Sequence, residues 1–345
     1  MIAAVFHGIE RVDVEEVDKP SAGSGEVVVK VGANTICGTD VRILRGQKTK
    51  GITPPVVLGH ELAGSVAEVG KDVEGFEAGD AVVVSPQIPC GRCARCRRDL
   101  ENFCVNIRIL GYDVPGGLAE YVKVPREAVA AGCIFPASGS SSFEELALAE
   151  PLACCINGHE KSGTGLGDTV VVLGAGPIGL FHLQLSLLAG ARDVIVSEPS
   201  RERREAARSF GATQAVEPEE LAETVQIVTD GEGADVAVVC IGIPDLVNEA
   251  IRLARPGGRV NVFAGLSGAG WAEVEANLIH YKELVVTGSA NSRRRDFETA
   301  ISLIEGGRVD ARRMVTHRYP LAEAVRAIEK SASGEAIKVA VTPGG

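Results

Sequence analysis

The sequence lacks an apolar stretch of about 18 uncharged residues, the length that a bilayer-spanning helix needs. Its first residues, MIAAVFHGIE, lack the basic segment and apolar core of a secretory signal. Positive charge is also scarce, because 46 acidic residues outnumber 35 basic ones and give a net charge of −11. These absences argue against membrane and nucleic-acid partners. We therefore expect a cytoplasmic protein that acts on a small molecule.

Cysteine is present in an odd number, nine, and several cysteines lie in apolar segments. That usage indicates a reducing compartment in which thiols stay free or bind metal. Four of them have the spacing C-x2-C-x2-C-x7-C within residues 90–104, which predicts a closed tetrahedral site for a structural Zn²⁺. An iron–sulfur cluster uses similar spacings and remains an alternative, whereas a disulfide knot fits a reducing compartment poorly. The four predicted ligands are Cys90, Cys93, Cys96 and Cys104, and Arg92, Arg95, Arg97 and Arg98 are expected to offset their charge.

With 345 residues the chain exceeds the size of most single cores, so two domains are expected. Residues 1–150 contain short β-like segments such as EVVVKVGA and DAVVVSP, separated by glycine. From Gly167 onward, apolar strands alternate with helical segments, and about six strands of this kind predict a doubly wound parallel sheet. The tail from Asn291 holds two amphipathic helices and a last strand, IKVAV, that should return to the first lobe.

A glycine motif follows the predicted strand TVVVL and opens a helix. Its glycines are Gly174, Gly176 and Gly179, in the G-x-G-x-x-G order of dinucleotide-binding folds. The first permits a tight turn, the second lets backbone N–H groups approach a pyrophosphate, and the third allows close helix–strand packing. The helix N-terminus adds partial positive charge for the phosphates.

The next predicted strand, DVIVS, ends at Glu198, nineteen residues after Gly179. A carboxylate there can accept hydrogen bonds from the ribose hydroxyls and would repel a 2′-phosphate, which favours NAD over NADP. Three arginines follow closely and leave the alternative open, because a reoriented guanidinium could bind that phosphate. They are Arg201, Arg203 and Arg204.

Three further segments carry metal-ligand residue types: Cys37 in ICGTD, His60 and Glu61 in LGHELAG, and Glu150 in LAEPLAC. Each residue taken singly could be an ordinary core side chain. Together with the cysteine loop, GGLAEYV, GAGPIG and GRVNVFAG, they make the chain resemble the zinc-dependent medium-chain dehydrogenases of the alcohol dehydrogenase superfamily. The resemblance extends over essentially the whole chain. It is strongest toward the branch that contains sorbitol dehydrogenase and L-threonine 3-dehydrogenase, to which EPLA and SEPS point.

The resemblance implies an α/β fold with two domains. A GroES-like, mostly β catalytic domain would span 1–152 and 290–345 and carry the zinc loop 90–104. A Rossmann domain with a six-stranded, doubly wound parallel sheet would span 153–289. It also implies a homo-oligomer, a dimer or, by analogy with the polyol branch, a homotetramer.

The resemblance further implies a catalytic zinc bound by Cys37, His60 and a carboxylate, with Glu61 and Glu150 both candidates, and it makes Thr39 the partner of the substrate hydroxyl. Two zinc ions and one NAD are thus expected per chain. Zinc would acidify the bound alcohol, and the zinc-bound alkoxide would pass a hydride to NAD. The expected cofactor-binding residues are Gly174, Gly176, Pro177, Ile178, Gly179, Glu198, Arg203, Ile241, Gly265, Ser289 and Lys338.

Arg42 departs from the pattern, since many relatives carry a proton-relaying histidine five positions after the first zinc cysteine. Arginine does not titrate near neutral pH, so the proton should leave through Thr39 and a ribose hydroxyl, or with help from Glu61 or Glu150. Arg42 is then expected to bind cofactor or an oxygen-rich substrate, or to form a surface salt bridge.

Taken together, the sequence predicts an NAD-dependent polyol, sugar-alcohol or cyclitol dehydrogenase. L-threonine oxidation is the alternative, and a catalytically inactive dinucleotide-binding protein is a remote one.

Overall fold

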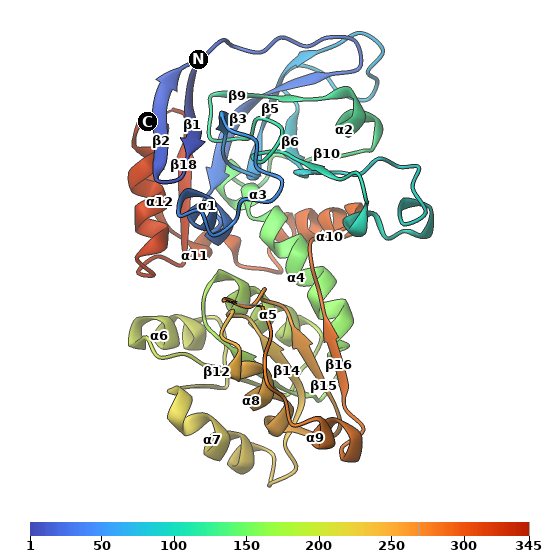
Figure 1. The fold of residues 1–345 in the computed structure, drawn as a ribbon, viewed down its shortest axis with the longest axis vertical. Helices are drawn as coiled ribbons and strands as arrows, with labels where there is room; N and C mark the ends of the chain where they lie inside the picture. The colour runs from blue at the N-terminus through green and yellow to red at the C-terminus, as the bar shows by residue number, and fades with distance from the viewer. Residues whose placement is uncertain (269, 345) are drawn as a thin grey trace. The chain divides into compact units, whose positions relative to one another are not determined.

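A computed structural model describes residues 1–268 and 270–344, which divide into two compact units. The first unit joins Met1–Ala153 to Ser292–Gly345, and the second is Cys154–Asn291. The chain leaves the first unit within helix α4 (Ala149–Ser162) and returns to it after strand β16 (Val285–Gly288) (Figure 1). Across the described ranges, every helix is too short or too polar to cross a bilayer.

The first unit is built on antiparallel strands around a seven-stranded sheet, as the β-like segments predict. Val27–Thr35 (β3) lies at its centre, because it pairs with three other strands. The C-terminal strand pairs with β3 in the register Ala340↔Thr35, so the tail returns to the first lobe as predicted. The sheet runs β10 (Ile134–Pro136), β6 (Ala81–Val84), β5 (Glu61–Val69), β3, β18 (Lys338–Thr342), β17 (Val315–Pro320), with β9 (Tyr121–Val124) also on β3.

Smaller elements complete the first unit. A three-stranded sheet has the order β2 (Arg11–Glu16), β1 (Ile2–Gly8), β4 (Val56–Val57), and β7 (Gln87–Ile88) pairs with β8 (Arg108–Ile109). Apolar side chains such as Ile36, Leu58 and Val339 are buried beneath the helices α1 and α12. The helices are α1 (Gly38–Leu44), α2 (Arg126–Ala130), α3 (Phe143–Ala147), α10 (Arg294–Glu305), α11 (Ala311–Met314) and α12 (Ala324–Ala332).

The second unit is a six-stranded parallel sheet with helices between its strands (Figure 1). Its inner strand Thr169–Leu173 (β11) is buried at every residue, as expected for a strand covered on both faces. The strand order reverses between β11 and β14, and ligands of such sheets bind at that switch point. The order is β13 (Gln214–Val216), β12 (Asp193–Ser197), β11, β14 (Ala234–Val239), β15 (Ala254–Val262), β16, and the helices are α5 (Pro177–Leu188), α6 (Arg201–Ser209), α7 (Leu221–Val228), α8 (Asp245–Leu253) and α9 (Ala276–Tyr281). This confirms the doubly wound sheet that the sequence predicts.

Candidate functional site

The four-cysteine loop gathers its sulfur atoms within 4.8 Å of one another, and all four thiols are free. The sulfurs of Cys93 and Cys96 lie 3.5 Å apart. A disulfide would hold them at about 2.05 Å, whereas a tetrahedral zinc with Zn–S bonds of about 2.3 Å spaces its sulfurs by roughly 3.8 Å. The geometry therefore fits a metal cage.

Backbone amides in this loop already favour negative charge on part of the cage. The amide of Cys96 donates to Cys93 Sγ and lowers the pKa of Cys93 to about 6. Burial, together with the neighbouring sulfurs of Cys93 and Cys104, raises the pKa of Cys96 to about 12. Four sulfurs at this spacing cannot all ionise unless a cation lies among them.

Two of the four arginines in this segment hold the backbone of the loop. Arg95 donates to the carbonyl of Phe103 at 2.8 Å, and Arg97 donates to the carbonyl of Arg92 at 2.9 Å. The Arg95 bond joins the start of the 3₁₀ turn Cys96–Arg98 to the turn Glu101–Phe103, and the Arg97 bond joins the first turn to the segment before it. The arginines therefore brace the loop, in addition to any effect of their charge on the thiolates.

A second group of metal-ligand types lies in the same unit, with two of its three members buried and Cys37 half-buried. Donor atoms of Cys37, His60 and Glu61 lie within 4.8 Å of one another. Cys37 is the N-cap of α1, two residues after β3, while His60 directly precedes the adjacent strand β5 and Glu61 is the first residue of that strand. His60 is 4% exposed and Glu61 is fully buried. A thiolate, an imidazole and a carboxylate converging there match the donor set of a catalytic zinc with one position left open.

Asp40 positions both of the first two residues in this group. Its Oδ2 accepts the Cys37 amide at 2.9 Å, which closes the capping box of α1. Its Oδ1 lies 3.3 Å from His60 Nδ1, so Nε2 is the ring nitrogen left to bind a metal. Burial alone would lower the pKa of His60, but the Asp40 carboxylate outweighs it and raises that pKa well above its usual value. Sequence reasoning missed this role, although an acid three residues after an N-cap is a recognisable signal.

Glu61 is held by two partners. Lys338 Nζ donates to its carboxylate at 2.7 Å, and the Thr35 hydroxyl donates to its other oxygen. Burial would lower the pKa of Lys338, but the Glu61 charge outweighs that effect and raises it. Lys338, which the sequence places among cofactor-binding residues, is thus found beside the buried carboxylate.

Glu150 lies in the first turn of α4 and is 7% exposed. Within the described residues it is not part of the converging group, but its charge contributes to the raised pKa values of Tyr112 and Lys338, so it borders the site. The Tyr112 ring packs edge-on to His60, with 5.5 Å between ring centroids. Thr39 is half-buried in α1, two residues after Cys37.

The glycine motif adopts the predicted strand–turn–helix. Gly174 has φ +103°, where a side chain is strained. A Cβ on Gly179 would lie 1.8 Å from the Gly174 carbonyl oxygen, so the third glycine lets α5 approach β11. Gly176 is the N-cap of α5 with Pro177 at N1, and a Cβ on Gly176 would meet nothing within 4 Å. The turn is therefore open on the side where a phosphate would lie.

Glu198, directly after β12, brings its carboxylate against this turn. Its Oε2 accepts the Ala175 amide at 2.8 Å, and its Oε1 accepts the Ser200 amide at 3.1 Å. The side chain is 5% exposed. It is therefore fixed beside the glycine turn, where a ribose would lie next to the pyrophosphate.

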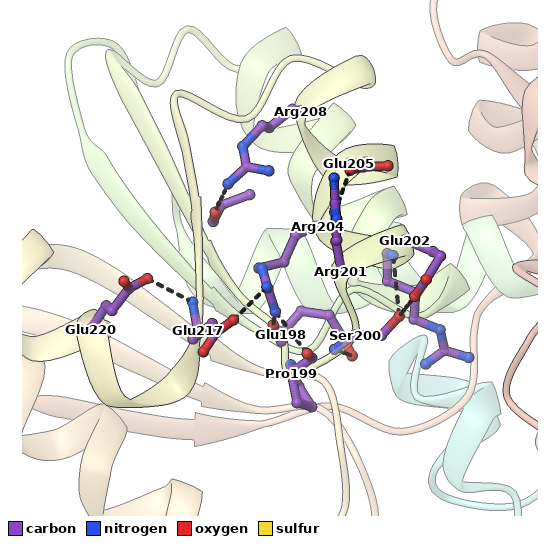
Figure 2. Close-up of polar contacts among 12 residues, drawn as sticks. Glu198, Pro199, Ser200, Arg201, Glu202, Arg204, Glu205, Arg208, Glu217 and Glu220 are labelled. Atoms are coloured by element: carbon purple, nitrogen blue, oxygen red, sulfur yellow. Dashed lines mark hydrogen bonds and ion pairs between the residues drawn. The ribbon is translucent and has the colours of Figure 1, made fainter.

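Two of the three arginines that follow are committed to protein partners (Figure 2). Arg204 donates to the carbonyls of Glu198 and Pro199 and to the Glu217 carboxylate, at 2.9, 2.7 and 2.6 Å. Arg201 pairs with Glu205 one helical turn away. Arg203 is half-buried, and its amide bonds to the Ser200 hydroxyl at 3.3 Å.

The remaining cofactor candidates lie at the carboxyl ends of strands in the second unit. Ile241 follows β14, is 43% exposed and lies 3.5 Å from where a Gly174 Cβ would stand. Gly265 follows β15, and the Ser289 hydroxyl after β16 lies 3.3 Å from Asn261 Oδ1.

Arg42, for which a surface salt bridge is one expectation, is exposed on α1, and no ion pair among the described residues includes it. The remaining expectation for Arg42 is that it binds the cofactor or the substrate.

Comparison with known proteins agrees with this geometry. The family model described as alcohol dehydrogenase GroES-like domain matches residues 23–133, and the one described as zinc-binding dehydrogenase matches residues 177–306. Fold and site together define a class, the two-domain dehydrogenases in which a GroES-like unit accompanies a Rossmann sheet. Within that class, the chain belongs to the zinc-binding alcohol dehydrogenase family, and its relatives include polyol dehydrogenases.

Two curated relatives carry different substrate names. The L-threonine 3-dehydrogenase of Pyrococcus abyssi is 37% identical over 89% of this chain and 88% of the relative. The sorbitol dehydrogenase of Halalkalibacterium halodurans is 34% identical over 98% of this chain and 97% of the relative. Among solved structures, a zinc-binding dehydrogenase of Sinorhizobium meliloti 1021 bound to NADP is 36% identical, covers 99% of both chains and superposes with a TM-score of 0.92.

Proposed function

We propose that this protein is a zinc- and NAD-dependent dehydrogenase that oxidises a secondary alcohol of a polyol, sugar alcohol or cyclitol to the ketone. The substrate carbon gives a hydride to NAD, and the hydroxyl proton is released. The observation that carries the proposal is the buried convergence of Cys37, His60 and Glu61. The open glycine turn with Glu198 beside it supplies the dinucleotide site that such a reaction needs.

Cys37, His60 and a carboxylate from Glu61 or Glu150 would hold the catalytic zinc. Zinc bound there supplies a Lewis acid that makes a hydroxyl acidic near neutral pH. Asp40 holds the His60 ring in orientation, and Lys338 balances the Glu61 charge. Thr39 would hydrogen-bond the substrate hydroxyl and take its proton toward solvent, because position 42 holds an arginine in place of a proton-relaying histidine. Four cysteines of the loop 90–104 would hold a second, structural zinc.

NAD rather than NADP is the proposed acceptor. Glu198 would repel a 2′-phosphate, and Arg201 and Arg204 already have acidic or carbonyl partners. One related structure is bound to NADP, so the affinities for the two cofactors should be compared directly. Titrating NADH and NADPH against the protein by fluorescence should give at least tenfold tighter binding of NADH, and equal affinities would contradict the assignment.

L-threonine is the second candidate substrate, favoured by the relative that is 37% identical. Binding an amino acid requires an acidic partner for its ammonium group. Asp113 is occupied by Arg108 and by the Ile109 amide, while Asp40 is buried against Cys37 and His60. Because neither acid is available for an ammonium group, a substrate without an amino group is favoured over an amino alcohol.

The test is a substrate comparison with NADH formation as the readout. Purified zinc-loaded protein would be given sorbitol, xylitol, inositols and L-threonine with NAD. Turnover of a polyol or cyclitol above that of L-threonine is expected. Turnover of L-threonine alone would replace the proposed substrate class, and no NADH with any alcohol would contradict the dehydrogenase assignment.

We also propose a homo-oligomer that forms through the edge of the Rossmann sheet. β16 is the last strand of that sheet, and Val285 and Val286 are 47% and 39% exposed. Tyr281, just before it, is 78% exposed. Exposed apolar edge strands are covered in native proteins, commonly by another strand. Light scattering should therefore give a dimer or tetramer, and Val286→Lys should reduce the mass.

A further inference from the structure

Residues 41–60 of this acidic protein contain no carboxylate but four basic residues. This segment follows the first metal-ligand residue and ends at the second, so it borders the converging group at both ends. The basic residues are Arg42, Arg45, Lys48 and Lys50.

Among the residues that the structure describes, no ion pair includes any of these four side chains. Arginines elsewhere in the same unit have acidic partners, for example Arg312 with Glu145 and Arg318 with Glu144. The ammonium of Lys48 makes a single long hydrogen bond, at 3.5 Å, to the Lys50 carbonyl. Within the described residues, the positive charge of the segment therefore has no carboxylate paired with it.

Tyr112 connects this charge to the metal-ligand group. Lys48 Nζ lies 5.0 Å from the centre of the Tyr112 ring. The Tyr112 ring centre lies 5.5 Å from that of His60. The Lys48 ammonium is therefore within about 10.5 Å of the His60 ring, a span that a short carbon chain can bridge.

Lys48 is half-buried over the Tyr112 ring, whose face attracts the ammonium, but no ion pair among the described residues offsets its burial. Burial, with repulsion from Arg42 and Lys50, lowers the pKa of Lys48. A solvated surface cation would extend into water and avoid both effects. An anion bound among these three side chains would relieve the repulsion.

We propose that Arg42, Lys48 and Lys50 form a subsite for a phosphomonoester group of the substrate, so that the alcohol oxidised at the zinc site is a phosphorylated polyol. This rests on the proposed function and narrows its substrate class. A phosphomonoester carries close to two negative charges at neutral pH, which suits three cations. Arginine offers a fork of donors and lysine a point charge, and both are used for phosphate. A carboxylate carries one charge, and an amino acid would add an ammonium group that this segment would repel.

The first experiment compares sorbitol, sorbitol 6-phosphate and L-threonine as substrates of the zinc-loaded protein with NAD. The phosphate ester should have the highest kcat/KM, by about ten- to a hundredfold over sorbitol, because each charge-assisted hydrogen bond strengthens binding. Inorganic phosphate should inhibit competitively against the alcohol. Equal or lower kcat/KM for the phosphate ester, or preference for L-threonine, would overturn the subsite.

The second experiment uses Lys48→Met and Lys50→Met, with Lys71→Met as the matched control. Lys71 is an exposed lysine of the same unit, and no ion pair among the described residues includes it. The two subsite variants should lose at least tenfold in affinity for sorbitol 6-phosphate by calorimetry and in kcat/KM, while sorbitol turnover and the control stay within twofold. An equal loss for both substrates would contradict a phosphate subsite. Oxidation of sorbitol without any phosphate preference would leave the proposed function standing, whereas no NADH with any alcohol would contradict the proposed function itself.

Discussion

The two candidate metal sites of this chain are built in opposite ways. The four cysteines come from fifteen consecutive residues, in a loop that lies between β7 and β8 and contains two 3₁₀ turns. Cys37 instead caps the N-terminus of α1, and His60 and Glu61 lie where β5 begins. The loop supplies four thiol ligands, whereas the buried group supplies one thiol, one imidazole and one carboxylate.

The difference lies in what holds the ligands. In the loop, Arg95 and Arg97 brace the backbone, whereas the sulfurs contact only each other and nearby polar groups, so a metal would be the main element that fixes the ligand side chains. In the buried group, neighbouring side chains hold every ligand: Asp40 contacts both Cys37 and His60, and Lys338 contacts Glu61. A site that needs its metal for folding and a site that the fold holds ready should respond differently to the same kind of substitution.

The largest effect is expected for His60→Ala. Loss of this ligand should reduce kcat/KM by at least about a thousandfold, because a zinc Lewis acid contributes several kcal/mol to the transition state. The free energy of unfolding should change far less than the activity, because β3 and β5 hold the site. Steady-state kinetics and chemical denaturation check both. A variant that keeps near wild-type turnover would remove the group from the active site.

Cys96→Ser, in contrast to His60→Ala, should affect the free energy of unfolding more than the activity. Losing one of four thiolates should release the loop metal and lower the free energy of unfolding by about 3 kcal/mol or more, because structural zinc binding is folding energy. Arg98→Gln, an exposed residue of the same loop, is the control and should keep its metal. Unchanged denaturation of Cys96→Ser would show that the loop does not depend on a metal.

Lys338→Met tests the charge balance behind Glu61. Both side chains are buried, and removing one partner of such a pair costs about 3–5 kcal/mol. Lys338→Met combined with Glu61→Gln should recover most of that stability while activity stays low. Additive losses in the double variant would show that the two residues do not form a coupled pair.

Asp40→Asn should weaken metal binding at the buried site and leave the loop metal in place. Partners of ligand histidines typically contribute about 10- to 100-fold in metal affinity. Competition with a chelator, followed by the zinc content of the recovered protein, measures both sites in one sample. Equal weakening at the two sites would contradict a specific role for Asp40.

The smallest effect concerns a second buried histidine, His182 of α5, whose pKa, unlike that of His60, is not raised by a carboxylate. Both ring nitrogens lack a hydrogen-bond partner among the described residues, and burial lowers its pKa to about 3. The histidine of the unfolded state titrates near 6.5, so between about pH 6.5 and 3 only the unfolded state binds the extra proton. The free energy of unfolding therefore decreases as the pH is lowered through this range. From pH 7 to pH 5 the wild type should lose about 2 kcal/mol through this group, and His182→Leu should not. The same pH dependence in both proteins would exclude His182 as its source.

The sequence predicts the loop and the glycine turn well because each is local. Cys90 to Cys104 and Gly174 to Gly179 lie within fifteen and six residues, so spacing alone indicates their geometry. The partners of Glu61 are not local. Thr35 meets Glu61 through the β3–β5 register, and β18 brings Lys338 to the same edge through Ala340↔Thr35. A single sequence does not specify such registers, so neither Thr35 nor the contact between Lys338 and Glu61 was predicted, and the cofactor-binding role of Lys338 stays a prediction.

The zinc content of wild type and of Cys37→Ser/His60→Ala, measured by elemental analysis on folded protein, tests the account most directly. The account predicts two zinc ions per chain in the wild type, and one in the variant, which stays folded and does not oxidise alcohols. A single zinc in the wild type, or a variant that retains both zinc ions or its turnover, would contradict it.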